Sequence, residues 1–320
     1  SGRKGKAAPA APSRRTWPFV VAAVAVAALA VAGVFFLKRP APPPALLVEV
    51  PHGADQRAHY DALRSRMVGT FPADLHIYFH VNTDIGAYQY GRCVAEQLVQ
   101  ARPNLSALVI RCLIPRTFID TNRREDATEN LAQAGLTAGV APYVRHGDDI
   151  ALLLSLHRAY VGLAERAYRL VCDAKGFALS PHTYGPRSMD IAKIDDSIVE
   201  ELRKAHLPEH WARWPVRPEL DFITVAPDGK RYAPAGLVES LTEAFKAAGV
   251  TASDSATYKL HPSAQGSRWA MEYPDRFLCL EVRRDLLVEA YTPFEQMTVR
   301  PDQAERFARP LSAAISARLR

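Results

Sequence analysis

The sequence predicts an α/β domain in which a mixed, mostly parallel sheet carries helices on both faces. Short apolar runs alternate along the chain with longer segments of helical periodicity, as they do where helices connect the strands of one sheet. Several of the short runs are apolar on consecutive residues, which is typical of strands buried on both faces. With 320 residues, 48% hydrophobic and 23% charged, the chain has the composition of a globular protein with a substantial core.

The expected elements follow one another without an evident domain boundary after the first 46 residues. Expected strands are ALLVEV (45–50), LHIYFHV (75–81), SALVIRCLI (106–114), FALSPH (177–182), DFITVA (221–226) and RFLCLEV (276–282). Expected helices cover 86–101, 151–174, 234–248 and 301–319, the last with apolar residues at i, i+3 and i+4 spacing. Residues 47–320 are therefore predicted to form one domain.

The N-terminal part of the chain predicts a membrane anchor. The segment 17–37 is apolar and uncharged, and a helix of ~20 residues spans the ~30 Å hydrocarbon layer of a bilayer. We expect a single transmembrane helix over 17–37, a disordered basic cytoplasmic tail over 1–16 and a proline-rich spacer over 38–46. The positive-inside rule then predicts a single-pass inner-membrane protein whose domain of residues 47–320 faces the periplasm.

A cleaved signal peptide is the alternative reading of the same segment. Arg14 and Arg15 would form its basic region, and small residues at 30–32 would offer a cleavage site. The apolar run continues through Phe35, Phe36 and Leu37, which favours the uncleaved anchor.

The net charge of +6 belongs to the N-terminal segment and not to the domain. Residues 1–46 contain seven basic residues and no acidic one, so that 33 of the 40 lysines and arginines remain against 34 acidic residues. A nearly neutral domain gives no indication of nucleic-acid binding. The four cysteines are too few for a disulfide scaffold.

Residue types that bind zinc stand at the ends of predicted strands. The candidates are His52 and Asp55 after the first strand, Asp84 after the second, and His182 at the end of the fourth. Open α/β sheets bind ligands at the carboxyl ends of their strands, and two histidines with one acid leave a fourth position open, as in a catalytic zinc site. Each residue also has a structural alternative, since an acid at these places can cap the helix that follows. Asp55 and Asp84 both remain candidates for the third ligand.

Two further groups predict substrate chemistry. Arg116, Asn122 and Arg123 follow the third strand and bring together donors that match a carboxylate, with Asp120 as the partner that holds an arginine in place. A solvated basic loop is the alternative. Glu281 stands within an apolar strand, where a carboxylate either pairs with Arg283 or Arg284 or works as a general base.

Five motifs together resemble the N-formylglutamate amidohydrolase family. They are VPHGAD, NTDIGA, IPRTFIDTNR, SPHTYGPRS and LCLEVRRDLL, in the family's order, and they span residues 50–290. The resemblance implies a zinc-carboxypeptidase/phosphorylase-hydrolase-like fold and one Zn²⁺ per chain. It implies these roles: His52 and His182 as zinc ligands with Asp55 or Asp84, Glu281 as general base, Arg116 polarising the scissile carbonyl, and Asn122, Arg123 and Arg283 binding the substrate.

The sequence thus predicts a membrane-anchored, zinc-dependent amidohydrolase. Its expected substrate is a small carboxylate-bearing N-acyl amino acid or peptide, and the expected export favours an amide of the cell envelope. A catalytically inactive binding domain of a cell-envelope assembly and a peptide-trimming carboxypeptidase are the alternatives.

Overall fold

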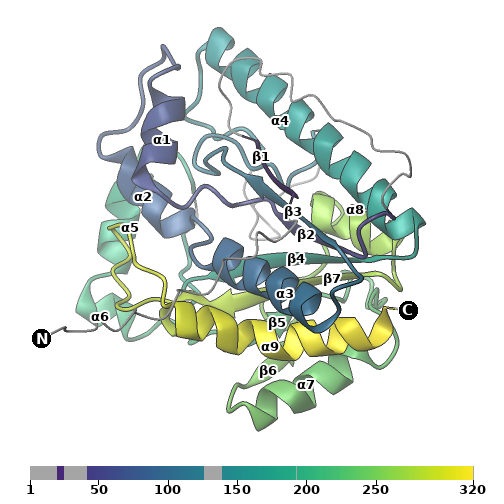
Figure 1. Cartoon of the computed structure of the whole chain (residues 1–320). Coiled ribbons are helices and arrows are strands. Elements are labelled where there is room, and N and C mark those ends of the chain that lie inside the picture. Colours follow the sequence, from purple (N-terminus) through teal and green to yellow (C-terminus); the bar gives the residue numbers. More distant parts are fainter. Residues whose placement is uncertain (1–19, 25–41, 126–138, 192, 320) are drawn as a thin grey trace, which may run out of the picture.

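A seven-stranded mixed sheet forms the centre of the protein, here a computed structural model that describes residues 20–24, 42–125, 139–191 and 193–319 (Figure 1). The strands lie in the order β1-β3-β2-β4-β7-β5-β6. Neighbours are parallel except for β5, which runs antiparallel to β7. The strands are β1 (Val20–Val24), β2 (Leu46–Val50), β3 (Ala107–Cys112), β4 (Phe177–Tyr184), β5 (Leu220–Phe222), β6 (Ala252–Asp254) and β7 (Phe277–Arg283).

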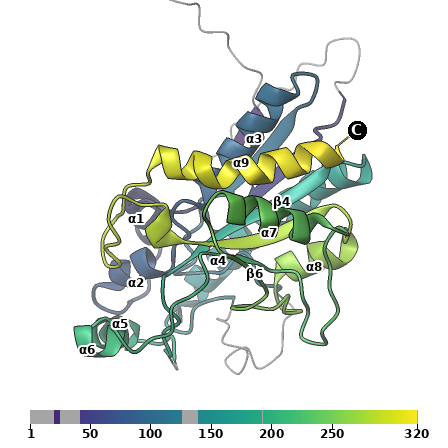
Figure 2. The same cartoon turned by 90° about the horizontal axis from the view of Figure 1, so that it is seen from below.

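Helices cover both faces of this sheet, which confirms the predicted mixed, mostly parallel α/β architecture (Figures 1 and 2). On one face pack α3 (Ala87–Ala101), α7 (Leu237–Ala247) and α9 (Pro301–Arg318). On the other face are α1 (Arg57–Arg64), α2 (Leu75–Asn82), α4 (Gly147–Tyr168), α5 (Ile198–Ala205) and α8 (Gln265–Glu272). The short α6 (Pro208–Trp211) follows α5, a π-helical turn (Arg169–Asp173) extends α4, and a 3-10 turn (Arg284–Leu286) follows β7.

The alternation of residues along β2 shows how the two cores arise. Leu46, Val48 and Val50 point into the core beneath α3 and α9, while Leu47 points into the core beneath α4. Glu49 is buried on the α4 side, where the hydroxyls of Tyr160 and Tyr168 donate to its two carboxylate oxygens at 2.8 and 3.0 Å. A strand that is apolar on consecutive residues therefore supplies both layers.

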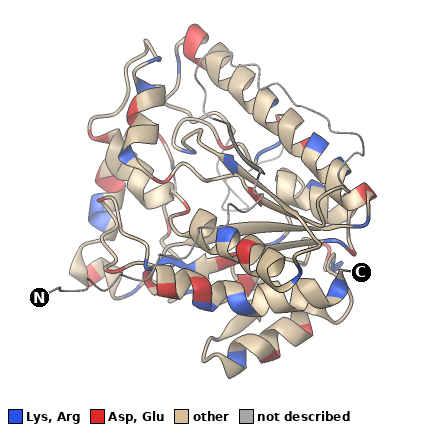
Figure 3. Ribbon diagram, viewed as in Figure 1, with Lys and Arg blue, Asp and Glu red and all other residues tan. Residues whose placement is uncertain are grey.

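The surface charge agrees with the near-neutral balance of the domain. Acidic and basic residues are interspersed on the visible helices (Figure 3), so this view shows no helix face of a single sign.

One predicted strand, 75–81, is a helix instead, α2. Its buried residues Leu75, Tyr78 and Phe79 stand at i, i+3 and i+4, so one helical face meets the core. An apolar run of this length does not distinguish a strand from a buried helix by periodicity alone, which explains the wrong prediction.

The predicted transmembrane helix over 17–37 is wrong where the structure describes the chain. Val20–Val24 forms strand β1, which pairs in parallel with β3. Within the described ranges no helix is both long and apolar enough to cross a bilayer. The predicted single-pass inner-membrane localisation with a periplasmic domain depended on that helix and is therefore wrong as well. An uncharged apolar run also fits a strand of a parallel sheet, and length alone misled the prediction. The tail 1–16, the rest of 17–37 and residues 38–41 of the spacer lie outside the described residues.

Substitution of a glycine in α3 tests how tightly this helix packs on the sheet, and a glycine in α4 serves as the control. A Cβ atom on Gly91 in α3 would lie 2.9 Å from Pro181 Cγ and 3.0 Å from Val48 Cγ1, whereas one on Gly162 in α4 would meet nothing within 4 Å. We expect Gly91→Ala to lower the free energy of unfolding by ~1–3 kcal/mol through overpacking. The matched control Gly162→Ala should raise it by up to ~1 kcal/mol through helix propensity. Urea unfolding measures both, and equal effects would contradict the close contact.

Candidate metal centre

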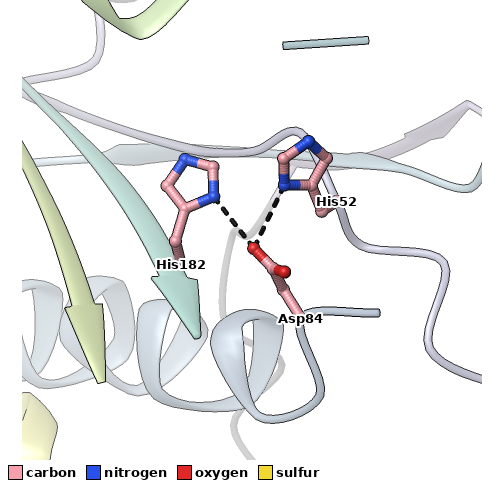
Figure 4. A group of neighbouring side chains, drawn as sticks. All are labelled: His52, Asp84 and His182. Atoms are coloured by element: carbon pink, nitrogen blue, oxygen red, sulfur yellow. Dashed lines mark hydrogen bonds and ion pairs between the residues drawn. The ribbon is translucent and has the colours of Figure 1, made fainter. Parts of the chain in front are cut away.

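Three side chains from separate parts of the chain converge at the carboxyl edge of the sheet (Figure 4). His52 follows β2, His182 lies in the neighbouring strand β4, and Asp84 lies between α2 and α3. Asp84 Oδ2 is 3.1 Å from His52 Nδ1 and 2.9 Å from His182 Nδ1. All three residues are buried, and their ligand atoms lie within 4.8 Å of one another.

Hydrogen bonds to its backbone hold the turn that carries His52. The hydroxyl of Thr121 donates to the Pro51 carbonyl at 2.8 Å, and the hydroxyl of Thr83 donates to the Ala54 carbonyl at 2.6 Å. Arg111 Nε donates to the Gly53 carbonyl at 2.9 Å. The turn after β2 is therefore tied to β3 and to the segment that carries Asp84.

Asp84 is the acid that the fold brings to the histidines. The N-cap of α3 is Gly86, whose φ of 92° lies in the left-handed region, so the carboxylate of Asp84 is not used to cap that helix. Asp55, by contrast, accepts from Arg111 Nη2 at 2.5 Å and from Gln89 Nε2 at 3.2 Å. Of the two acids left open by the sequence, the geometry favours Asp84 as a ligand.

A second carboxylate, that of Asp120, contacts the other ring nitrogen of His52. Asp120 Oδ1 lies 2.7 Å from His52 Nε2, and Oδ2 accepts from Arg116 Nε at 3.1 Å. Arg123 Nη2 lies 3.6 Å from the same Oδ2. Asp120 thus holds arginines, as the sequence predicted, and in addition orients His52, a role for which the sequence carries no local signal.

The charges of this cluster shift its pKa values. Burial works against ionisation of Asp84, yet His52 and His182 hold its pKa well below the usual range. Burial also opposes ionisation of Asp120, but Arg116, Arg123 and His52 lower its pKa. Burial and Arg116 oppose protonation of His52, but Asp120 and Asp84 raise its pKa. Both acids are therefore carboxylates, which is the form that binds metal ions.

The chemistry of these groups fits a divalent metal ion. Two imidazole nitrogens and one carboxylate oxygen form a donor set typical of zinc with an open fourth position. Asp84 Oδ1 is buried without a hydrogen-bond partner among the described residues, and the closest guanidinium nitrogens, of Arg284 and Arg116, are 3.6 and 3.9 Å away. A cation bound by Asp84 would compensate this carboxylate.

The cluster borders a cavity of about 260 Å³ that is rich in cationic groups. His52, His182 and Glu281 contribute to its lining. The lining cations are Arg116, Arg123, Arg187, Arg217, Lys259 and Arg284. Among the described residues the acid that lines this cavity is Glu281, so the balance of charge favours an anionic ligand.

Glu281 lies beside His182 across the pairing of β4 with β7. Its Oε2 atom is buried and lacks a hydrogen-bond partner within the described part of the chain. Burial, with the neighbouring charge of Asp84, raises the pKa of Glu281 to about 7, although His182 opposes the shift. A carboxyl group with a pKa near neutrality can both accept and return a proton.

The arginines predicted as partners of Glu281 are engaged elsewhere. Arg283 Nε pairs with Asp285 Oδ1 at 2.9 Å, and Arg283 is not part of the cavity lining. Arg284, which does line the cavity, donates to the carbonyls of Thr183 and Val81. Of the two arginines, Arg284 and not the predicted substrate-binding residue Arg283 lines the cavity.

Asn122 and Arg123 line the cavity as expected for substrate-binding residues. Asn122 Oδ1 accepts from Gly266 N at 2.9 Å, which turns the amide oxygen toward α8 and fixes this side chain. The backbone carbonyl of Arg123 contacts His157 Nε2 at 2.7 Å. His157, to which the sequence assigned no role, thereby supports the segment that carries both residues.

Comparison with known proteins bears on the fold. No protein-family model and no curated protein matches this sequence. The solved structure of the Atu2144 gene product from Agrobacterium tumefaciens is similar at 15% identity and a TM-score of 0.52, over 87% of this chain and 91% of that one. An N-formylglutamate amidohydrolase structure from Ralstonia eutropha JMP134 aligns at 16% identity and a TM-score of 0.45, over 86% and 92%. At 15% identity the likeness to the Atu2144 structure concerns the fold alone.

The two candidate acids can be separated by metal binding. We expect Asp84→Asn to weaken Zn²⁺ binding by at least 100-fold, since it removes the anionic ligand between two imidazoles. The matched control Asp55→Asn should stay within about threefold, because Asp55 is paired with Arg111. Competition with a chromophoric chelator measures both affinities. A larger loss in the Asp55 variant would contradict the assignment.

Proposed function

We propose that this protein is a zinc-dependent amidohydrolase that cleaves an amide bond of a small carboxylate-bearing N-acyl amino acid or peptide. One observation carries the proposal: a buried His-Asp-His cluster shares a cavity with Glu281, a carboxyl group without a hydrogen-bond partner in the described structure. A metal site beside a carboxyl group of near-neutral pKa is an arrangement that can catalyse amide hydrolysis. The motif resemblance to N-formylglutamate amidohydrolases supplies the reaction class.

His52, Asp84 and His182 would hold the zinc ion. When bound, Zn²⁺ supplies a Lewis acid for the amide carbonyl and lowers the pKa of a water molecule. Asp120 fixes the ring of His52 through Nε2, so that Nδ1 faces Asp84 and His182. The protein thus sets the orientation of the donor atoms before any ligand arrives.

Glu281 moves the proton in this reaction. Its carboxylate accepts a proton from the attacking water and then donates it to the leaving nitrogen, which departs as an amine. Burial raises the pKa of Glu281, so its carboxylate is a stronger base than that of an exposed glutamate. One group can therefore serve both transfers.

The cations of the cavity bind and polarise the substrate. Arg123 and Asn122 offer donors for the free carboxylate, for which a guanidinium fork and an amide are suited. Arg116 lies 3.9 Å from Asp84 Oδ1 and lines the same cavity, so its charge can stabilise the carbonyl oxygen as it becomes negative.

The open cavity also bears on the alternatives. A retired binding domain would be expected to have a collapsed or filled site, whereas here the cavity reaches both histidines and Glu281. The predicted cell-envelope amide rested on the membrane anchor and is no longer supported. Assays of N-acyl amino acids beside short peptides separate an amidohydrolase from a carboxypeptidase.

Replacing the proposed base tests the mechanism. Glu281→Gln should lower kcat by about 10²- to 10⁴-fold, since it removes the proton carrier, and should leave zinc content unchanged. Glu289→Gln, the same change at an exposed glutamate, is the control. Turnover of N-acyl amino acids, N-formylglutamate included, is measured with zinc content by elemental analysis. Undiminished turnover in the Glu281 variant would refute its role.

The titration of Glu281 can be observed in the metal-free protein. Because its pKa is raised to about 7, the group is a neutral acid below that pH and a carboxylate above it. Difference infrared spectra over a pH series should lose a protonated-carboxyl band with a midpoint near 7. The band should be missing from Glu281→Gln, and its persistence there would assign it to another acid.

A further inference from the structure

Besides cations such as Arg116 and Arg123, the cavity is lined by a group of apolar residues. Some of these residues lie on α2 and α5, which pack against each other, and the others lie in the segment between β4 and α5. We call this group the apolar wall, and its members are Tyr78, Val81, Met189, Ile191, Ile194, Ile198 and Leu202.

The apolar wall is held in place by the core behind it. Ile198 and Leu202 on α5 are only 1% and 2% exposed and belong to the same core cluster as Phe79 on α2. Ile191 and Ile194 pack against this cluster but stay partly exposed, so they present apolar surface to the cavity. The surface is therefore formed before a ligand binds, which limits the entropy lost on binding.

The chemistry of this wall selects among substituents. A charged or strongly polar group placed against it would lose its hydration without gaining hydrogen bonds, which is unfavourable. A branched aliphatic group would lose contact with water and gain contact with four aliphatic side chains, Ile191, Ile194, Ile198 and Leu202. Burying a group the size of a leucine side chain typically improves binding by about tenfold or more.

We propose that the apolar wall receives a branched aliphatic group of the substrate, carried either by the acyl part or by the amino acid. The protein would then prefer N-acyl amino acids with such a group over those whose substituents are small or acidic. This inference rests on the proposed function, because it places the group in the cavity beside the scissile amide.

The test measures binding without hydrolysis. Zinc-loaded Glu281→Gln protein is titrated in a calorimeter with N-acetylglycine, N-acetyl-L-leucine, isovalerylglycine and N-acetyl-L-glutamate. We expect N-acetyl-L-leucine or isovalerylglycine to bind at least tenfold more tightly than N-acetylglycine, with a more negative heat-capacity change. The tighter of the two tells whether the side chain or the acyl group meets the wall. Affinities within twofold of N-acetylglycine, preferred binding of N-acetyl-L-glutamate, or no measurable binding would overturn the inference.

A variant of the wall makes the test specific. Ile194→Asp should reduce the affinity ratio of the preferred branched ligand to N-acetylglycine at least fivefold, and the milder Ile194→Ala should reduce it in the same direction. Val68→Asp, at a residue 67% exposed and outside the cavity lining, should keep the wild-type ratio. An unchanged ratio in both Ile194 variants would overturn the inference. Hydrolysis by the wild-type protein is assayed separately. Tight binding of a branched ligand without turnover would contradict the proposed function but would still support the selectivity of the apolar wall.

Discussion

The contact of one carboxylate oxygen with two imidazoles is the interaction on which the site depends. Asp84 Oδ2 lies within hydrogen-bond distance of His52 and His182, which come from turns and strands far apart in the chain. The parallel strands β2 and β4 bring the two histidines to one sheet edge, and a left-handed glycine before α3 lets the preceding acid turn toward them. Without the sheet order these groups would not meet.

Around this contact the protein balances charge among buried side chains. Asp84 and Asp120 are both buried carboxylates, and the guanidinium groups of Arg116, Arg123 and Arg284 lie close to them. Buried charges persist only when they are paired, and here the pairing also sets the direction of each donor. The same contacts thus contribute to stability and fix the donor atoms of the candidate metal centre.

Glu281 departs from this balance, because its buried Oε2 atom has no hydrogen-bond partner within the described residues. Its neighbours Arg283 and Arg284 are committed to Asp285 and to backbone carbonyls. The consequence is a carboxyl group that titrates near neutrality beside a site suited to a cation. A buried carboxyl group without a hydrogen-bond partner lowers the stability of the fold. Such groups tend to be found where proteins carry out chemistry.

Local sequence patterns predicted a large part of the fold and part of the candidate site. Periodicity located the buried strands β2, β3, β4 and β7 and the helices α3 and α9. The placement of His52 and His182 near strand ends indicated a metal site. Such patterns are local, because each reflects which faces of a single element are buried. Only the tertiary structure favours Asp84 over Asp55: the pairing of Val50 with Arg111 brings that arginine to Asp55, with which it forms an ion pair. It also decided that 75–81 is a helix and that 20–24 is a strand, since an apolar run fits either state until its neighbours are known.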